Sequence, residues 1–188
     1  GHRMYWKYAK DFHIKFTPIK KLAQDSETKS CTSITKSESS LKSASYKLPS
    51  KVIKIKPSQF TNIYVRAEIK TPSTFSGETY KDIFLIGDIR ACKALFGGFR
   101  NKRIFIGAQC GSIVQGPELK VNTNYLLEFD YNFHTKKATI WVDKNLVKQE
   151  TKNLTIVDGF ITFGSGYHTK DAEKFTGDIK SIQIYKNT

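Results

Sequence analysis

The sequence predicts an all-β protein, an antiparallel β-sandwich or jelly roll, on three observations. Segments in which apolar and polar residues alternate recur along the chain, and Gly, Pro, Asn and Asp separate them as they do in turns. No segment keeps a helical period for three turns. Aromatic residues, which favour strands, make up 13% of the chain. These features favour two packed antiparallel sheets over alternating strands and helices.

The clearest strand is predicted at residues 62–70, where apolar residues alternate with polar ones. One side of this strand is expected to face a core and the other side solvent. Val65, Phe129 and Ile184 are expected to share one interior. Further strands are expected through Ile53 and Ile55 and at residues 82–88, 103–109, 124–133, 136–142, 159–166 and 175–187.

The first part of the chain has a different composition. One strand is predicted through Phe12, Ile14 and Phe16, ended by Pro18. The following stretch, residues 24–45, is so rich in Ser, Thr and Lys that a surface loop is expected, with a short edge strand near Ile34. A chain of 188 residues is expected to form a single domain. Within it, residues 1–44 are expected to supply the early strand and the loop, and residues 45–188 the core of the sandwich.

The charge balance predicts an anionic partner. The chain carries 31 basic and 17 acidic residues, for a formal net charge of +14. A field of this sign attracts acidic or sulfated polysaccharide, an anionic membrane surface or nucleic acid. The lysines are spread along the chain, so an ordinary solubilising surface is the alternative. Nucleic acid is disfavoured because most aromatic residues fall on the predicted core sides. No apolar run reaches the roughly 18 residues that membrane insertion needs.

Three cysteines, Cys31, Cys92 and Cys110, and four histidines show no zinc-binding spacing. Pairing Phe99 with Arg103 across a turn at residues 100–102 would place Cys92 opposite Cys110. A disulfide between these two cysteines is then one alternative. A bulge at Gly97-Gly98, which would shift the register and separate them, is the other.

Several segments carry a resemblance to a known family. They are "YVRAEIK", "FLIGD", "NTNYLLEFDYN" leading into "KATIWVDKNLV", "FITFGSG" and "FTGDIKSIQIY". In this order, over residues 45–187, they resemble a laminin-G-like domain of the concanavalin A-like lectin and glucanase superfamily. The resemblance implies a concanavalin A-like jelly roll of two curved sheets. The chain departs from the family where Asp143-Lys144-Asn145 replaces an Asp-Gly turn, and residues 1–44 have no counterpart beyond the early strand.

Some members of this superfamily hydrolyse glycosides with carboxylates spaced Glu-x-Asp-x-(x)-Glu on one strand. Here the corresponding stretch places Glu128 and Asp130 on one side, with Asn132 where a third acid is required. An amide serves neither as nucleophile nor as acid. No Ser-His-Asp arrangement or phosphate-binding glycine loop is found either. The sequence therefore predicts a protein that is not an enzyme.

Trp141 falls on the polar side of the predicted strand 136–142, which makes it the leading candidate for sugar contact. Its neighbour across the turn depends on register. In one register Asp130 faces Trp141 and Glu128 faces Asp143, whereas a shift of two residues brings Glu128 opposite Trp141. In either register an indole for stacking lies beside hydrogen-bonding groups. Burial beneath the loop 24–45 or against a partner is the alternative for Trp141.

The predicted ligand-binding residues lie in three places. The sheet face carries Tyr64, Arg66, Glu128, Asp130, Asn132 and Trp141. The basic hairpin tip carries Arg100 and Arg103, and the connection near residue 167 carries Tyr167 and His168. Arginines of this kind pair with sulfate or carboxylate groups, or they form an ordinary charged turn. No cofactor is expected. Calcium, which many laminin-G-like domains use, is an alternative, although no loop dense in oxygen ligands is present.

Together these observations predict a noncatalytic, lectin-like carbohydrate-binding module in adhesion or attachment, extracellular or surface-associated, with anionic glycans among its ligands. One sequon, Asn153-Leu154-Thr155, is compatible with secretion. The alternative function is a structural or protein–protein interaction domain of a larger surface or virion assembly, with a protein partner or a second copy of the chain covering the sheet face.

Overall fold

The computed structural model describes most of the chain from residue 54 onward and four short strands before it. The described ranges of the main part are 54–75, 80–88, 91–163 and 175–187, with side chains at 56–75, 80–88, 91–159, 161 and 175–186. The backbone of the early strands is described at β1 (Arg3–Trp6), β2 (Phe12–Ile14), β3 (Lys36–Glu38) and β4 (Ala44–Lys47). β1 pairs with β4 and β2 with β3, and β2 lies next to β15 (Asp178–Asn187).

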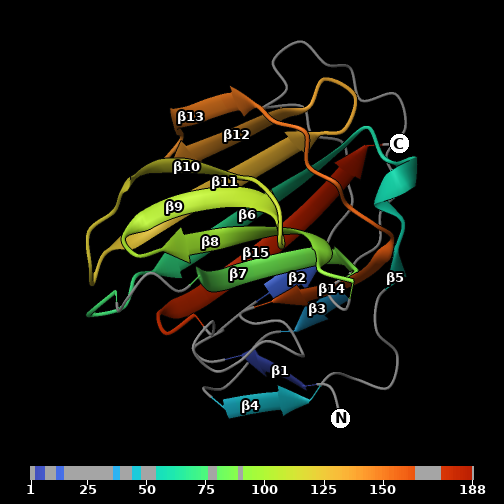
Figure 1. The fold of residues 1–188 in the computed structure, drawn as a ribbon. Helices are drawn as coiled ribbons and strands as arrows, with labels where there is room; N and C mark the ends of the chain where they lie inside the picture. The colour runs from blue at the N-terminus through green and yellow to red at the C-terminus, as the bar shows by residue number, and fades with distance from the viewer. Residues whose placement is uncertain are drawn as a thin grey trace.

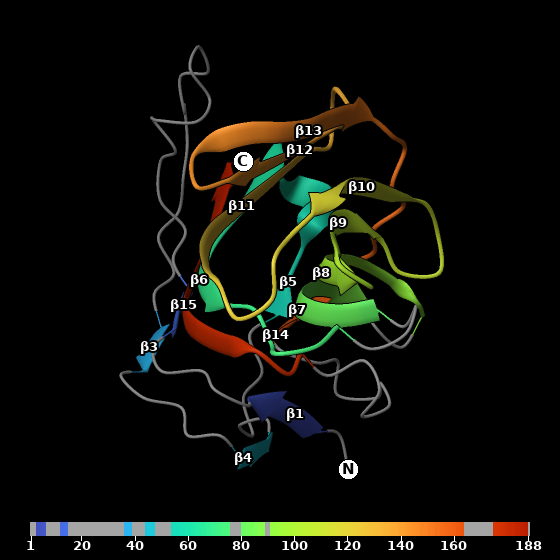
Figure 2. The same ribbon diagram turned by 90° about the vertical axis from the view of Figure 1, so that its left-hand side faces the viewer.

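Two antiparallel sheets packed face to face confirm the predicted all-β sandwich (Figure 1), and Figure 2 shows them as two layers. The five-stranded sheet has the order β13-β12-β11-β6-β15 and the six-stranded sheet the order β10-β9-β8-β7-β14-β5. A short 3₁₀-helix, η1 (Pro57–Gln59), precedes β6. The strands are β5 (Lys54–Ile55), β6 (Asn62–Lys70), β7 (Tyr80–Asp88), β8 (Lys93–Arg100), β9 (Arg103–Ala108), β10 (Ile113–Glu118), β11 (Asn124–Asn132), β12 (Lys137–Val142), β13 (Asn145–Thr151), β14 (Gly159–Phe163) and β15 (Asp178–Asn187).

The core lies between the two sheets. In the five-stranded sheet, Phe129 pairs with Val65 and Val65 pairs with Ile184, so the three side chains form one row. Each of them is at most 1% exposed. Across the interior, the Phe84 ring of the opposite sheet meets the Phe129 ring edge-on, with centroids 5.1 Å apart. The predicted common interior of Val65, Phe129 and Ile184 is therefore confirmed.

Strands β7, β8 and β9 are apolar on both faces. Besides the side chains that point into the core, a second buried cluster lies on the other face of the six-stranded sheet, and it contains Leu85, Ala94, Phe96 and Phe105. Phe96 pairs across strands with Gly107, and Phe105 with Gly98, so each aromatic side chain has a glycine beside it. Aromatic residues stabilise strand glycines in this arrangement. Burial on both faces explains why residues 83–87 and 104–108 are continuous apolar runs.

The β11–β12 hairpin has the second of the two registers that the sequence left open. Glu128 lies opposite Trp141 and Asp130 opposite Thr139. The first register, with Asp130 facing Trp141 and Glu128 facing Asp143, is wrong. The reason is the turn geometry: Asn132 accepts hydrogen bonds from the backbone amides of His134 and Thr135, both at 2.9 Å, which sets the length of the turn.

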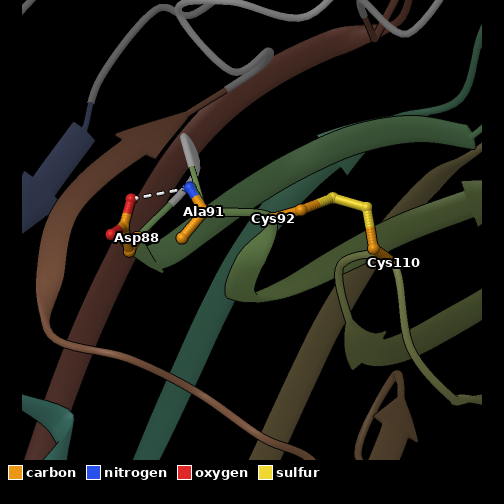
Figure 3. The surroundings of a disulfide bond; sticks show 4 residues. All are labelled: Asp88, Ala91, Cys92 and Cys110. Atoms are coloured by element: carbon orange, nitrogen blue, oxygen red, sulfur yellow. Dashed lines mark hydrogen bonds between the residues drawn. A yellow bond between two sulfur atoms is a disulfide. The ribbon is translucent and has the colours of Figure 1, made fainter.

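The β8–β9 hairpin is also shifted from its predicted register. Arg100, not Phe99, pairs with Arg103, so the turn contains only Asn101 and Lys102. The Cys92–Cys110 disulfide nevertheless forms, with the two Cα atoms 5.6 Å apart (Figure 3). Both cysteines lie in turns beyond the strand ends, with φ of 58° and 57°. The predicted facing position within two strands was therefore wrong, although the pairing of these two cysteines was anticipated as one alternative.

The β12–β13 turn predicts a stabilising substitution. Asp143 and Lys144 have φ of 49° and 69°, in the left-handed region that costs a non-glycine residue roughly 1 kcal/mol or more. Lys144→Gly should therefore raise the free energy of unfolding by about 1 kcal/mol in a chemical denaturation experiment. Lys144→Ala is the matched control, because it removes the same charge and keeps the Cβ. An equal gain in both variants would mean that charge, not backbone conformation, is responsible.

Two strands of the sandwich, β10 and β13, were not anticipated from sequence. Each is the outermost strand of its sheet. Edge strands bury less on either face, so their apolar alternation is weak, and β10 contains Gly116 and Pro117, which disfavour a central strand. Of the N-terminal predictions, the early strand is present as β2, and the short strand expected near Ile34 lies at Lys36–Glu38. The remainder of the stretch 24–45 lies largely outside the described residues.

Candidate functional site

The outward face of the five-stranded sheet gathers predicted site residues from its three central strands. Alternation places Tyr64 and Arg66 of β6, Glu128 and Asp130 of β11 and Trp141 of β12 on the side that faces away from the core. The structure therefore brings together five of the six residues that were predicted from the sequence for the sheet face. We call this surface the outward sheet face.

One row of the outward sheet face combines an aromatic ring, a carboxylate, a guanidinium and an amide. Trp141 pairs with Glu128, Glu128 with Arg66, and Arg66 with Gln183. We call these four residues the Trp141 row. Arg66 Nη1 donates to Gln183 Oε1 at 3.5 Å, and Arg66 Nη2 lies 3.4 Å from Glu68 Oε1. Gln183 was not predicted, because its neighbours are known only once β15 is placed beside β6.

The floor of the Trp141 row is a buried hydrogen bond. Tyr64 OH donates to Glu128 Oε2, and both residues are 5% exposed. Burial and the Glu128 carboxylate raise the pKa of Tyr64 well above its ordinary value of 10. The Tyr185 ring packs on the Tyr64 ring with centroids 5.4 Å apart. The expectation that this polar side of strand 62–70 is fully solvated is thus wrong at Tyr64, because long side chains of neighbouring strands cover one another there.

Asp130 is the residue of β11 that follows Glu128 on the outward sheet face. It lies between Tyr64 on β6 and Thr139 on β12, and its Oδ1 accepts a hydrogen bond from Asn62 Nδ2 at 2.7 Å. Burial raises the pKa of Asp130 to about 7, and the Asn62 hydrogen bond lowers it in part. A raised pKa means that the environment disfavours the ionised carboxylate. Asp130 is therefore only partly ionised near neutral pH.

Trp141 is only partly buried, and it has an apolar neighbour at the sheet edge. The residue opposite it on β13 is Leu146, whose exposed fraction is 58%. The alternation of β12 places Ala138, Ile140 and Val142 in the core and leaves Trp141 on the other face. The accessible part of the Trp141 row therefore includes an indole surface that continues into an exposed leucine.

The other predicted site residues lie elsewhere. Asn132 closes the β11–β12 turn with its side chain, as described above. Arg100 and Arg103 belong to the six-stranded sheet: the Arg100 guanidinium lies 5.2 Å from the centroid of the Tyr80 ring, and Arg103 Nε donates to Gly116 O at 2.9 Å. The hairpin tip and the outward sheet face therefore belong to different sheets. Tyr167 and His168 lie outside the described residues.

The carboxyl groups of Glu128 and Asp130 on the outward sheet face are poorly suited to calcium. In the part of the chain that the structure describes, no group of three or more His, Cys, Asp or Glu side chains could hold a metal ion. Glu128 accepts a hydrogen bond from Tyr64, and the raised pKa of Asp130 opposes the ionised form that calcium prefers.

Among the described residues, no helix has the length and apolar character needed to cross a bilayer.

Comparison with known proteins finds likeness in structure alone. No family model and no curated protein sequence matches the chain. Among solved structures, the CBM40 of Ruminococcus gnavus IT-sialidase, bound to α2,3-sialyllactose, is 10% identical with a TM-score of 0.53, covering 73% of this chain and 86% of its own. The heptameric SAP-like pentraxin of Limulus polyphemus is 10% identical with a TM-score of 0.52, covering 66% and 64%. Domains LG4-5 of the mouse laminin α1 chain are 13% identical with a TM-score of 0.51, covering 100% and 44%.

The two packed antiparallel sheets define this chain as a jelly-roll β-sandwich. Its fold is similar to that of the laminin LG4-5 domains, the pentraxin and the CBM40, so the fold that the sequence resemblance implied is confirmed. The chain spans 64% of the pentraxin and 44% of the laminin pair, which are longer than it is.

Proposed function

We propose that this chain is a noncatalytic carbohydrate-binding module that holds a sugar on its outward sheet face. The observation that carries the proposal is the Trp141 row. A sugar ring has an apolar face that stacks on indole and hydroxyl groups that exchange hydrogen bonds with carboxylate, guanidinium and amide groups. Trp141, Arg66 and Gln183 supply the ring, the guanidinium and the amide side by side, above the Glu128 carboxylate, which is buried and bonded to Tyr64. The likeness to a CBM40 with a bound sialyllactose supports the same class of ligand.

The arrangement of the row supports binding over catalysis. Glu128 and Asp130 lie on one face, but the third position is Asn132, whose carboxamide closes a turn. A pKa of about 7 is a property that Asp130 shares with general acids. A second catalytic carboxylate is missing, however, because Glu128 is bonded to Tyr64 beneath the face. The raised pKa of Tyr64 also disfavours a phenolate nucleophile. Release of reducing sugar from a bound oligosaccharide would contradict this part of the proposal.

Anionic glycans are the favoured ligands because of charge. The net charge of +14 attracts sulfated or carboxylated chains, and Arg100, Lys102 and Arg103 add a basic tip on the six-stranded sheet. A disulfide between Cys92 and Cys110 supports an extracellular or surface location, because disulfides persist in oxidising compartments. Adhesion or attachment is the role that fits this location and this ligand.

A glycan array with matched variants tests the proposal. Trp141→Ala should weaken binding to the array hits by roughly tenfold or more, because truncating a central tryptophan removes most of the stacking surface. Val121→Ala is the control, since Val121 is an apolar residue of 39% exposure outside the Trp141 row. Thermal unfolding of both variants checks that the fold is intact. Equal binding by wild type and Trp141→Ala would contradict the outward sheet face as the site.

A protein-interaction domain is the second candidate, and Leu146 favours it. An exposed leucine opposite Trp141 extends the apolar surface to the open edge of β13, and apolar patches of this kind mark protein contacts. A silent array together with a molar mass that rises with concentration, and that falls back in Leu146→Ser, would support self-association through this surface and contradict the carbohydrate proposal.

A further inference from the structure

A pocket of about 430 Å³ opens at one end of the sandwich, away from the Trp141 row. It lies between η1 and the β11–β12 turn, which occupy the same end of the molecule (Figure 1). Ile156, in the connection after β13, completes the wall. The described residues that line it are Pro57, Ser58, Gln59, Phe60, Thr61, Phe133, His134, Lys136 and Ile156. None of them belongs to the Trp141 row, and none of them was predicted from the sequence as a site residue.

Hydrogen bonds hold both walls of this end pocket in place. Phe133 N donates to Thr61 O at 2.8 Å, which ties the β11–β12 turn to the start of β6. Ser58 donates twice to the Asp158 carboxylate, from its backbone N at 3.1 Å and from Oγ at 3.0 Å, which ties η1 to the connection after β13. Asn132 fixes the turn that carries His134 and Lys136. A pocket with walls bonded in this way is formed before any ligand enters.

The lining combines apolar side chains with hydrogen-bond donors that have no partner among the described residues. Phe60, Phe133 and Ile156 supply apolar surface. Among the described residues, neither the Lys136 ammonium nor the His134 ring has a hydrogen-bond or ion-pair partner. None of the described lining residues is acidic, and Asp158 beside the pocket is engaged by Ser58.

A lysine of β15 adds positive charge beside the pocket. The Lys186 ammonium lies 4.5 Å from the centroid of the Phe60 ring. A ligand that matches the pocket therefore carries an anionic group for Lys136, polar atoms for Gln59 and an apolar face for Phe133.

We propose that the end pocket binds the carboxylate-bearing sugar unit of an acidic glycan, with Lys136 and His134 on the carboxylate and Phe133 against the ring. This inference rests on the proposed carbohydrate-binding function. It adds a second subsite, which recognises the negative charge of the ligand. The Trp141 row contacts the apolar face of a sugar ring, and the end pocket binds the carboxylate of an acidic sugar unit.

Titration of the chain with sodium glucuronate, followed by NMR at constant ionic strength, tests the proposal. Glucose, which has the same ring without the carboxylate, is the uncharged probe. Glucuronate should shift the resonances of Phe133, His134 and Lys136, and glucose should leave them in place. Lys136→Gln should weaken glucuronate binding about five- to tenfold, the range expected for a lost charge-assisted hydrogen bond near the surface. Lys137→Gln should change it less than twofold, because Lys137 carries the same charge but does not line the pocket.

Three outcomes would overturn the proposal. They are equal binding of glucose and glucuronate, equal weakening by Lys136→Gln and Lys137→Gln, and glucuronate shifts that are spread over the basic surface. The test separates this proposal from the proposed function. Glucuronate shifts at the pocket together with a silent glycan array would retain the pocket and remove the outward sheet face. Array hits lost in Trp141→Ala without any glucuronate shift would do the reverse.

Discussion

An Asp130→Asn variant should be more stable than the wild type at pH 8, and this advantage should disappear near pH 4. Burial raises the pKa of Asp130 in the folded chain to about 7, above the ordinary value of 3.8 for the unfolded chain. The folded chain therefore holds this proton more tightly. The resulting stabilisation is complete below pH 4 and is lost as the pH rises to about 7.

The size of this effect follows from the two pKa values. The difference between about 7 and 3.8 corresponds to roughly 4 kcal/mol, as an upper limit, because one pKa unit is worth 1.36 kcal/mol. Asparagine has no proton to lose, and its carbonyl oxygen can still accept the hydrogen bond from Asn62. Chemical denaturation at several pH values between 4 and 8 measures the difference between variant and wild type.

A matched carboxylate controls for general pH effects. Glu118→Gln, at an exposed position near the end of β10, should change stability by less than about 0.5 kcal/mol at every pH. If Asp130→Asn followed the pH profile of the wild type, the Asp130 carboxyl would be ionised in the folded chain and the argument from burial would be wrong.

The double variant Cys92→Ser, Cys110→Ser should lose about 3 kcal/mol of unfolding free energy. The bridge closes a loop with a sequence separation of 18, and cross-links over loops of this length stabilise proteins by about 3 kcal/mol, chiefly by restricting the unfolded chain. The turn around Cys92 has its own support, because the Asp88 carboxylate accepts a hydrogen bond from Ala91 N at 3.0 Å (Figure 3). The folded conformation should therefore be retained in the double variant.

Denaturation of oxidised and reduced protein measures the contribution of the bridge. The reduced wild type and the double variant should unfold at the same denaturant concentration. Cys31→Ser, which leaves the Cys92–Cys110 bridge in place, controls for the loss of a thiol. Equal stability of the oxidised wild type and the double variant would show that the bridge contributes nothing to the folded state.

The outward sheet face was only partly predictable from the sequence. The alternation of residues 62–70 placed Tyr64 and Arg66 on the polar side, and the same argument placed Trp141. It did not reveal Gln183, which joins Arg66 only because β15 lies beside β6. The packing of Tyr185 on Tyr64 also joins residues far apart in the chain. Neighbour relations of this kind depend on strand order, which no local pattern contains.

The same limit applies to the end pocket and the hairpin registers. Phe60, His134 and Lys136 come from segments about 70 residues apart, and only the packing of η1 against the β11–β12 turn unites them. The register of β11 with β12 was left open between two choices, because a shift of two residues keeps every side chain on the same face. The hydrogen bonds of Asn132 to the turn amides decided between them.

The amino-acid sequence by itself determined that this protein is a sandwich of antiparallel strands and which side of most strands is buried. The reason is that a strand exposes alternate residues to different surroundings. Its period of two can therefore be recognised within a short segment of the sequence. The tertiary structure alone decided which polar residues meet, which side chains line the end pocket and how far the outward sheet face is covered. Those contacts join segments distant in the chain, and they follow from turn geometry and sheet order instead of local alternation.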